Sequence, residues 1–137
     1  MWVLAFRKRL KVVPVKGVHM SKWFGRKKNG MLLGAAKGIG AAYARDYAKL
    51  CHTLSFIDID KEAGMRLKED LEREYCIHVF FFHGNVYDEE DMDIFCKAVK
   101  EQFGSVHFLF NGFRNCPYLF MANDVLASGA VMECIGA

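Results

Sequence analysis

Three glycines in the stretch LLGAAKGIG, residues 32–40, are spaced as in a turn that binds a phosphate group. Gly34 permits a tight turn, Gly38 lets backbone N–H groups approach a pyrophosphate, and Gly40 lets a following helix lie close to its strand. The partial positive charge at the N-terminus of that helix favours a phosphate anion. The same glycines also fit an ordinary turn before a helix, so the residues that follow must decide between the two interpretations.

Asp58 is the next residue whose position suggests nucleotide chemistry. It stands about 20 residues past the turn, where a dinucleotide-binding fold places the carboxylate that binds ribose hydroxyls. Lys37 could instead reach an adenosine 2′-phosphate, as in NADP sites, but Asp58 would repel that phosphate. The two charges therefore favour NAD as the cofactor. The alternatives are a solvated Lys37 and a solvated carboxylate at a strand end.

A helix and a strand must hold the turn and Asp58 together. Apolar residues recur every three or four positions after the turn, which predicts one helix with a single buried face. The run Thr53–Ile57 predicts a buried strand that ends at Asp58. The residues expected on the buried helical face are Ile39, Ala42, Tyr43, Tyr47 and Leu50.

The alternation of helix and strand continues along the chain. Apolar residues at steps of four predict a second helix over residues 63–75, followed by a buried strand at Ile77–Phe82. A third helix, capped by Asp88 and ending at Gly104, leads to the strand Val106–Phe110. This order predicts an α/β, Rossmann-like doubly wound parallel sheet of about four strands. The last strand would then lie at or near a sheet edge, where copies of the chain could associate as a homo-oligomer or an aggregate.

Charge divides the sequence into a basic leader and one domain. Residues 1–28 hold nine of the 19 Lys and Arg and no acid, which leaves residues 29–137 with ten bases, all 16 acids and a net charge of −6. We therefore expect an unstructured leader that adds nothing to the fold, followed by a partial NAD-binding domain at residues 29–137. A basic, acid-free leader is also typical of a mitochondrial targeting segment. We expect no nucleic-acid partner for the domain itself.

Cysteines, histidines and hydropathy exclude several other classes of protein. The five cysteines are scattered and form no Cys-x2-Cys pair, which favours reduced thiols in a cytoplasmic protein over disulfides or a zinc site. The five histidines show no ligand spacing, so no metal site is expected. No apolar run approaches the roughly 20 residues of a membrane span, which predicts a chain without a transmembrane segment.

Four motifs in unbroken order resemble the short-chain dehydrogenases: GAAKGIG, the acid of FIDID, the Asn-Val pair after the third predicted strand, and FGSVHFLFNG. The resemblance covers residues 30–113 and implies NAD as cofactor and a secondary alcohol or ketone as substrate. GAAKGIG with IDIDKEAG looks most like the branch of the NAD-dependent hydroxyprostaglandin dehydrogenase and insect alcohol dehydrogenase. The cofactor-binding residues that the resemblance implies are Gly34, Lys37, Gly38, Ile39, Gly40, Asp58, Asn85, Val86 and Asn111.

The sequence departs from the family pattern at several of these positions. Asn85 replaces an Asp that holds the adenine amino group, and its amide oxygen could accept the same bond without the charge. Asn111 matches the first residue of Asn-Asn-Ala-Gly, but residues 112–114 read Gly-Phe-Arg, so bulky side chains stand where the family keeps its backbone close to the nicotinamide ribose. Asn123 is a candidate for the Asn that the family places in the next helix.

The residues that carry the family's reaction are missing from this sequence. That reaction needs a Tyr as acid or base, a Lys four residues later, and a Ser that polarises the carbonyl. None of the five tyrosines has a Lys at the fourth position after it, and we expect the chain to end before the fifth strand, where the Ser would lie. We therefore expect the cofactor-binding half of a dehydrogenase, a truncated product or fragment that is inactive alone.

Two other classes of function compete with that interpretation. One is a catalytically silent nucleotide-binding or interaction protein, which the missing Tyr and Lys would also explain. The other is a methyltransferase-like domain, since methyltransferases also place a Gly-rich turn before an acid on the second strand. The spacing of the three glycines and the motif FGSVHFLFNG both argue against methyl transfer.

Overall fold

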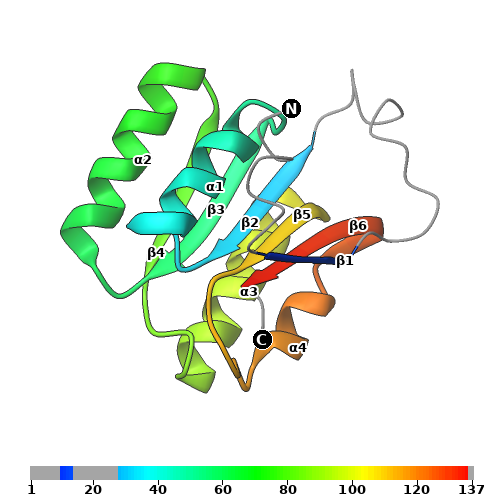
Figure 1. Cartoon of the computed structure of the whole chain (residues 1–137). Coiled ribbons are helices and arrows are strands. Elements are labelled where there is room, and N and C mark those ends of the chain that lie inside the picture. The colour runs from blue at the N-terminus through cyan, green and yellow to red at the C-terminus, as the bar shows by residue number, and fades with distance from the viewer. Residues whose placement is uncertain (1–9, 14–27, 136–137) are drawn as a thin grey trace.

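The computed structural model describes residues 10–13 and 28–135, which build one twisted sheet flanked by helices (Figure 1). The sheet has six strands in the order β1-β6-β5-β2-β3-β4. β2, β3, β4, β5 and β6 run parallel, and β1 pairs antiparallel with β6 at one edge. The strands are β1 (Leu10–Val13), β2 (Asn29–Leu33), β3 (Thr53–Asp58), β4 (His78–His83), β5 (Val106–Asn111) and β6 (Leu126–Ile135).

Helices cover both faces of the sheet, as the alternating pattern predicts. Side chains of α1 and α2 form one core cluster with one face of the strands, and α3 and α4 form a second cluster with the other face. The helices are α1 (Gly38–Ala48), α2 (Lys61–Tyr75), α3 (Glu89–Phe103) and α4 (Leu119–Asn123). None of the helices in the described residues is long and apolar enough to cross a lipid bilayer. The predicted Rossmann-like doubly wound fold is therefore confirmed.

Local signals set the bounds of the two long helices. Asp60 caps α2 by accepting a bond from the backbone N–H of Ala63, and Asp88 caps α3 by accepting one from Asp91. α2 ends where Cys76 takes up a left-handed conformation, and α3 ends at Gly104, which has a φ of 76°. The predicted cap at Asp88 and the end at Gly104 are both confirmed.

The expectation of about four strands is wrong, because the chain contains a fifth parallel strand. β6 pairs with β5 in parallel, with Asn111 opposite Cys134, so Val106–Phe110 lies inside the sheet and not at its edge. The pairing shifts register between Val106 and Phe108, and Gly129 in β6 has a φ of 77°. Such an irregular strand lacks the continuous apolar run by which the other parallel strands are recognised.

The leader also differs from the expectation, since Leu10–Val13 forms strand β1. Leu10 pairs with Ile135 and Val13 with Met132, so this short strand covers the outer edge of β6. Residues 1–9 and 14–27 lie outside the described residues. A further difference concerns Ile39, which was expected on the buried face of α1 but is 40% exposed, because it lies in the first turn of the helix.

Removal of residues 1–13 tests the contribution of β1. We expect a lower melting temperature and concentration-dependent association, because the deletion uncovers the unpaired N–H and C=O groups of β6. Removal of residues 1–9, which keeps β1, is the matched control and should leave both properties unchanged. Thermal unfolding and size-exclusion chromatography of the two deletions measure the difference. Equal behaviour of the two proteins would show that β1 adds nothing to the fold.

Candidate functional site

The candidate site lies where the carboxyl ends of β2 and β5 meet. After β2 the chain builds the sheet outward through β3 and β4, and it then resumes on the other side of β2 with β5 and β6. Such a reversal of strand order opens a crevice between the loops that follow the two strands, and doubly wound folds bind ligands there. Backbone bonds fix both loops: Gly34 donates to the carbonyl of Ile57, and Gly112 donates to the carbonyl of Leu33, each at 2.9 Å.

The three glycines of the turn have different structural roles. A Cβ on Gly40 would lie 2.0 Å from the carbonyl oxygen of Gly34 and 2.9 Å from the Cα of Ala35, so only a glycine allows α1 to lie this close to the turn. A Cβ on Gly38 would meet nothing within 4 Å, so this part of the turn is open. Gly34 and Gly38 have φ values of 79° and 60°, which also favour glycine.

The N-terminus of α1 faces this open part of the turn. Its cap residue, Lys37, makes no side-chain hydrogen bond to the helix, and the first turn contains no acid. The first N–H groups of a helix have no partner within the helix, and the helix dipole adds a partial positive charge there. Gly38, Ile39 and Gly40 form the start of α1, which is the kind of position at which proteins bind anions.

Asp58 is held beside the turn by two backbone hydrogen bonds. Its Oδ2 accepts a bond from the N–H of Ala36 at 3.0 Å, and its Oδ1 accepts one from the N–H of Asp60 at 2.9 Å. The residue is partly exposed at the end of β3. Each carboxylate oxygen has a second lone pair, so Asp58 can accept further bonds from a ligand while it keeps both backbone bonds.

Lys37 is not simply solvated, because it forms an ion pair with Asp60. The hydrogen bond from Lys37 lowers the pKa of the Asp60 carboxyl, and the same bond raises the pKa of the Lys37 ammonium. Since 72% of the Lys37 side chain is exposed, water screens the pair and it adds little stability. The ammonium is directed to Asp60, beside the turn.

Asn85 and Asn111 each shape a loop at the carboxyl edge of the sheet. The Oδ1 of Asn85 accepts a bond from the N–H of Tyr87, and the Oδ1 of Asn111 accepts one from the N–H of Phe113. Asn85 is exposed, so its amide remains accessible, whereas Asn111 is buried. Burial raises the pKa of the Cys134 thiol in β6, and a hydrogen bond from Asn111 opposes that shift. Val86 is buried in the core cluster beneath α3, so its side chain is structural.

Phe113 is the site residue whose position the sequence does not reveal. A Cβ on Gly34 would lie 2.5 Å from the Cε2 and 2.7 Å from the Cζ of the Phe113 ring, so the ring covers Gly34 directly. The ring of Tyr87 packs edge-on against Phe113, with the centroids 5.6 Å apart. The sequence shows that a bulky residue replaces a small one here, but only the fold shows that the ring turns toward Gly34.

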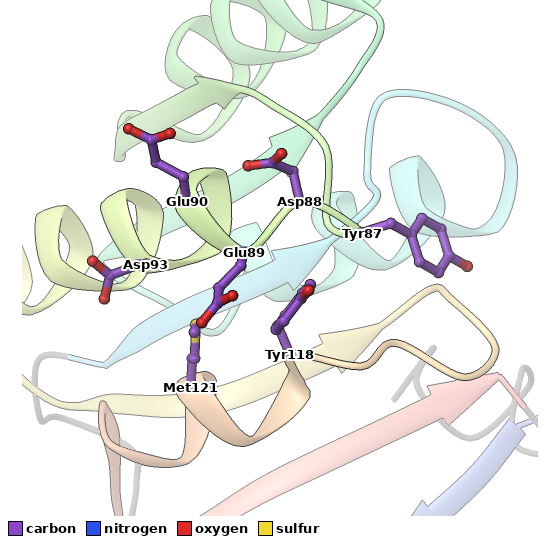
Figure 2. Close-up of a pocket in the computed structure, with 7 residues that line it drawn as sticks. All are labelled: Tyr87, Asp88, Glu89, Glu90, Asp93, Tyr118 and Met121. Carbon is purple, nitrogen blue, oxygen red and sulfur yellow. The ribbon is translucent and has the colours of Figure 1, made fainter.

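An open hollow of about 730 Å³ lies beside the site, between the start of α3 and α4 (Figure 2). Its lining residues are Tyr87, Asp88, Glu89, Glu90, Asp93, Tyr118 and Met121. Four carboxylates would repel a dinucleotide, which itself carries negative phosphates, so this hollow is not the cofactor site. Two of the acids lie in the first turn of α3, where their negative charge interacts favourably with the helix dipole and stabilises the helix.

Among residues 10–13 and 28–135, the two polar candidates after β5 lie outside the crevice. Asn123 is the last residue of α4 and is exposed. Ser128, in β6, lies near the start of that strand and therefore at the edge of the sheet opposite the turn. Among the described residues, no group of three or more His, Cys, Asp or Glu side chains could hold a metal ion.

Comparison with known proteins identifies the family. A family model described as short chain dehydrogenase matches residues 28–113. An uncharacterized oxidoreductase of Thermotoga maritima is 32% identical over 84 residues, which are 61% of this chain and 32% of that protein. The chain therefore belongs to the short-chain dehydrogenase family, which sets aside the methyltransferase interpretation.

Solved structures share the fold. An alcohol dehydrogenase from the archaeon Thermococcus sibiricus, complexed with 5-hydroxy-NADP, is 28% identical with a TM-score of 0.61, over 64% of this chain and 37% of that one. A short-chain dehydrogenase/reductase from Burkholderia phymatum, in complex with NAD, is 31% identical with a TM-score of 0.59, over 64% of this chain and 31% of that one. The chain thus spans about a third of the length of the relatives it matches.

Alanine at Gly40 and at Gly38 should have different effects on stability. Gly40→Ala forces a Cβ into the backbone of Gly34, so we expect a loss of about 3 kcal/mol in the free energy of unfolding. Gly38→Ala has open space and adds only left-handed strain, which costs about 1 kcal/mol. Urea unfolding of the two variants measures the difference. Equal losses would mean that the turn can relax around a Cβ at residue 40.

Proposed function

We propose that this chain is the NAD-binding portion of a short-chain dehydrogenase that oxidises secondary alcohols. The observation that carries the proposal is the Asp58 carboxylate, which two backbone bonds hold beside the glycine turn with lone pairs left for ribose hydroxyls. The open Gly38 and the uncapped start of α1 supply the anion-binding part of the same site. One NAD molecule would thus place its pyrophosphate at the start of α1 and its ribose at Asp58.

The charge at Asp58 favours NAD over NADP. The related structures contain both kinds of cofactor, since the Thermococcus sibiricus enzyme holds 5-hydroxy-NADP and the Burkholderia phymatum protein holds NAD. In this chain a 2′-phosphate would lie near the Asp58 carboxylate, which would repel it. Lys37 is the cation that could offset that repulsion, but it is paired with Asp60. Residues 34, 37–40, 58, 85, 86 and 111 form the proposed cofactor site.

The substrate class and the inactivity of this chain by itself are further parts of the proposal. The resemblance of GAAKGIG and IDIDKEAG to the hydroxyprostaglandin dehydrogenase branch supports a secondary alcohol or ketone as substrate. No Tyr-x3-Lys pair is present, so this sequence lacks the pair that moves the hydroxyl proton in the family's reaction. Free cysteines, including the exposed Cys76, support a reducing compartment such as the cytoplasm, and the basic leader supports a mitochondrial destination as the alternative.

Titration with NADH tests the cofactor assignment. Binding to the 137-residue chain, followed by nicotinamide fluorescence, should saturate and should be tighter for NADH than for NADPH. Asp58→Ala should weaken NADH binding by about tenfold, because the ribose loses its charged acceptor. Glu62→Ala removes a nearby exposed acid and is the matched control. Equal or tighter binding of NADPH by the unmodified chain would contradict the role of Asp58.

An alcohol oxidation assay tests the expected lack of activity. With NAD and a panel of secondary alcohols, the 137-residue chain should produce no NADH above background, because it has neither the Tyr nor the Lys of the reaction. A competent alcohol dehydrogenase assayed in parallel verifies the conditions. Alcohol-dependent NADH formation that disappears in a Gly38→Asp variant would show that this chain is catalytic by itself.

A further inference from the structure

The two ends of the glycine turn differ in accessibility. A Cβ on Gly38 would contact nothing, whereas a Cβ on Gly34 would collide with the ring of Phe113. The part of the turn that faces a phosphate is therefore open, and the part at the end of β2 is covered by a side chain of the same molecule. A dinucleotide must lie in the crevice between the loops after β2 and β5, and the ring bridges these two loops.

Several contacts hold the ring of Phe113 in this position. Its own N–H donates to the Oδ1 of Asn111 at 3.0 Å, and the backbone bond from Gly112 to Leu33 anchors the preceding residue. A Cβ on Gly112 would lie 2.7 Å from the carbonyl oxygen of Leu33, so the loop after β5 lies directly on the end of β2. The backbone thus directs the side chain at residue 113 across Gly34.

Tyr87, from the loop after β4, packs against the ring of Phe113. The two rings meet at an interplanar angle of 83°, and the Tyr87 hydroxyl donates to the carbonyl oxygen of Arg114 at 3.1 Å. Tyr87 is 49% exposed, so this support depends on one ring contact and one hydrogen bond near the surface. The ring of Phe113 also packs, partly buried, against the core cluster that includes Leu33 and Val86. A ligand that takes the place of the ring must offset both sets of contacts.

We propose that Phe113, supported by Tyr87, is an aromatic gate that closes the nucleoside part of the cofactor crevice and lowers the affinity of this chain for NAD. This inference depends on the proposed NAD site, because the gate determines how tightly that site binds NAD. Only protein molecules in which the Phe113 ring is displaced can bind NAD. The apparent dissociation constant for NAD is therefore the intrinsic constant divided by the fraction of such molecules. Phosphate alone can still reach Gly38, because no side chain covers it.

Substitution of Phe113 tests the gate by its effect on NADH affinity. In the full 137-residue chain, Phe113→Ala should tighten NADH binding by about tenfold, equivalent to about 1.4 kcal/mol. Inorganic pyrophosphate, measured as a competitor of NADH, should bind the variant and the unmodified chain equally. Phe120→Ala removes a 58% exposed ring on α4 and is the matched control, with no expected change.

A second variant covers the case in which Phe113→Ala lowers the melting temperature. Tyr87→Phe removes only the hydroxyl that donates to Arg114, and it should tighten NADH binding by about twofold without unfolding the chain. Unchanged or weaker NADH binding in both variants, with a saturable unmodified chain, would overturn the gate and leave the proposed function intact. No NADH binding by any of the proteins would overturn the proposed function and the gate together.

Discussion

The close approach of α1 to the end of β2 is the constraint on which the rest of the site depends. Gly40 brings the helix against the carbonyl of Gly34, at a distance that no side chain would allow. This contact aims the N-terminus of α1 at the crevice and sets the positions of Gly38 and Lys37. The two backbone bonds to Asp58 then join the same turn to the end of β3. The start of α1 and the Asp58 carboxylate thus have their positions fixed by backbone contacts.

The parts of the fold that the sequence predicts are those whose signals are local. The capping residues and apolar spacing of α2 and α3 lie within the helices themselves, and Thr53–Ile57 and Val106–Phe110 are continuous apolar runs. The strand β1 is not predictable from local signals, because it pairs with residues more than a hundred positions away. It also lies inside a basic segment that resembles a leader. β6 escapes it because Ser128, Gly129 and Glu133 interrupt its apolar character.

Within the site, residue identity is predictable from the sequence and orientation is not. The glycine spacing and the acid past the strand predict the turn and Asp58, and the structure places both at the carboxyl edge of the sheet. The sequence also shows that Phe113 stands where a small residue is expected. That its ring points at Gly34, rather than into solvent, follows from long-range contacts with Leu33 and Tyr87. These contacts exist only after β2, β4 and β5 have joined the same sheet.

The residues of the site differ in how much the fold itself requires them. Gly40 is needed to pack α1, Asp58 accepts two backbone bonds, and Asn111 shapes the loop after β5, so all three would be required even in a protein that binds nothing. Their presence alone is therefore weak support for a cofactor, and at Asp58 the support comes from the lone pairs that remain beyond its two backbone bonds. Asn85 shapes the loop after β4 in the same way, because its Oδ1 accepts a bond from the N–H of Tyr87. Gly38 has no such packing role, since a Cβ there would meet nothing within 4 Å. Ligand binding is thus best judged at Gly38 and at the ring of Phe113, where a substitution changes access to the crevice more than it changes the packing of the sheet.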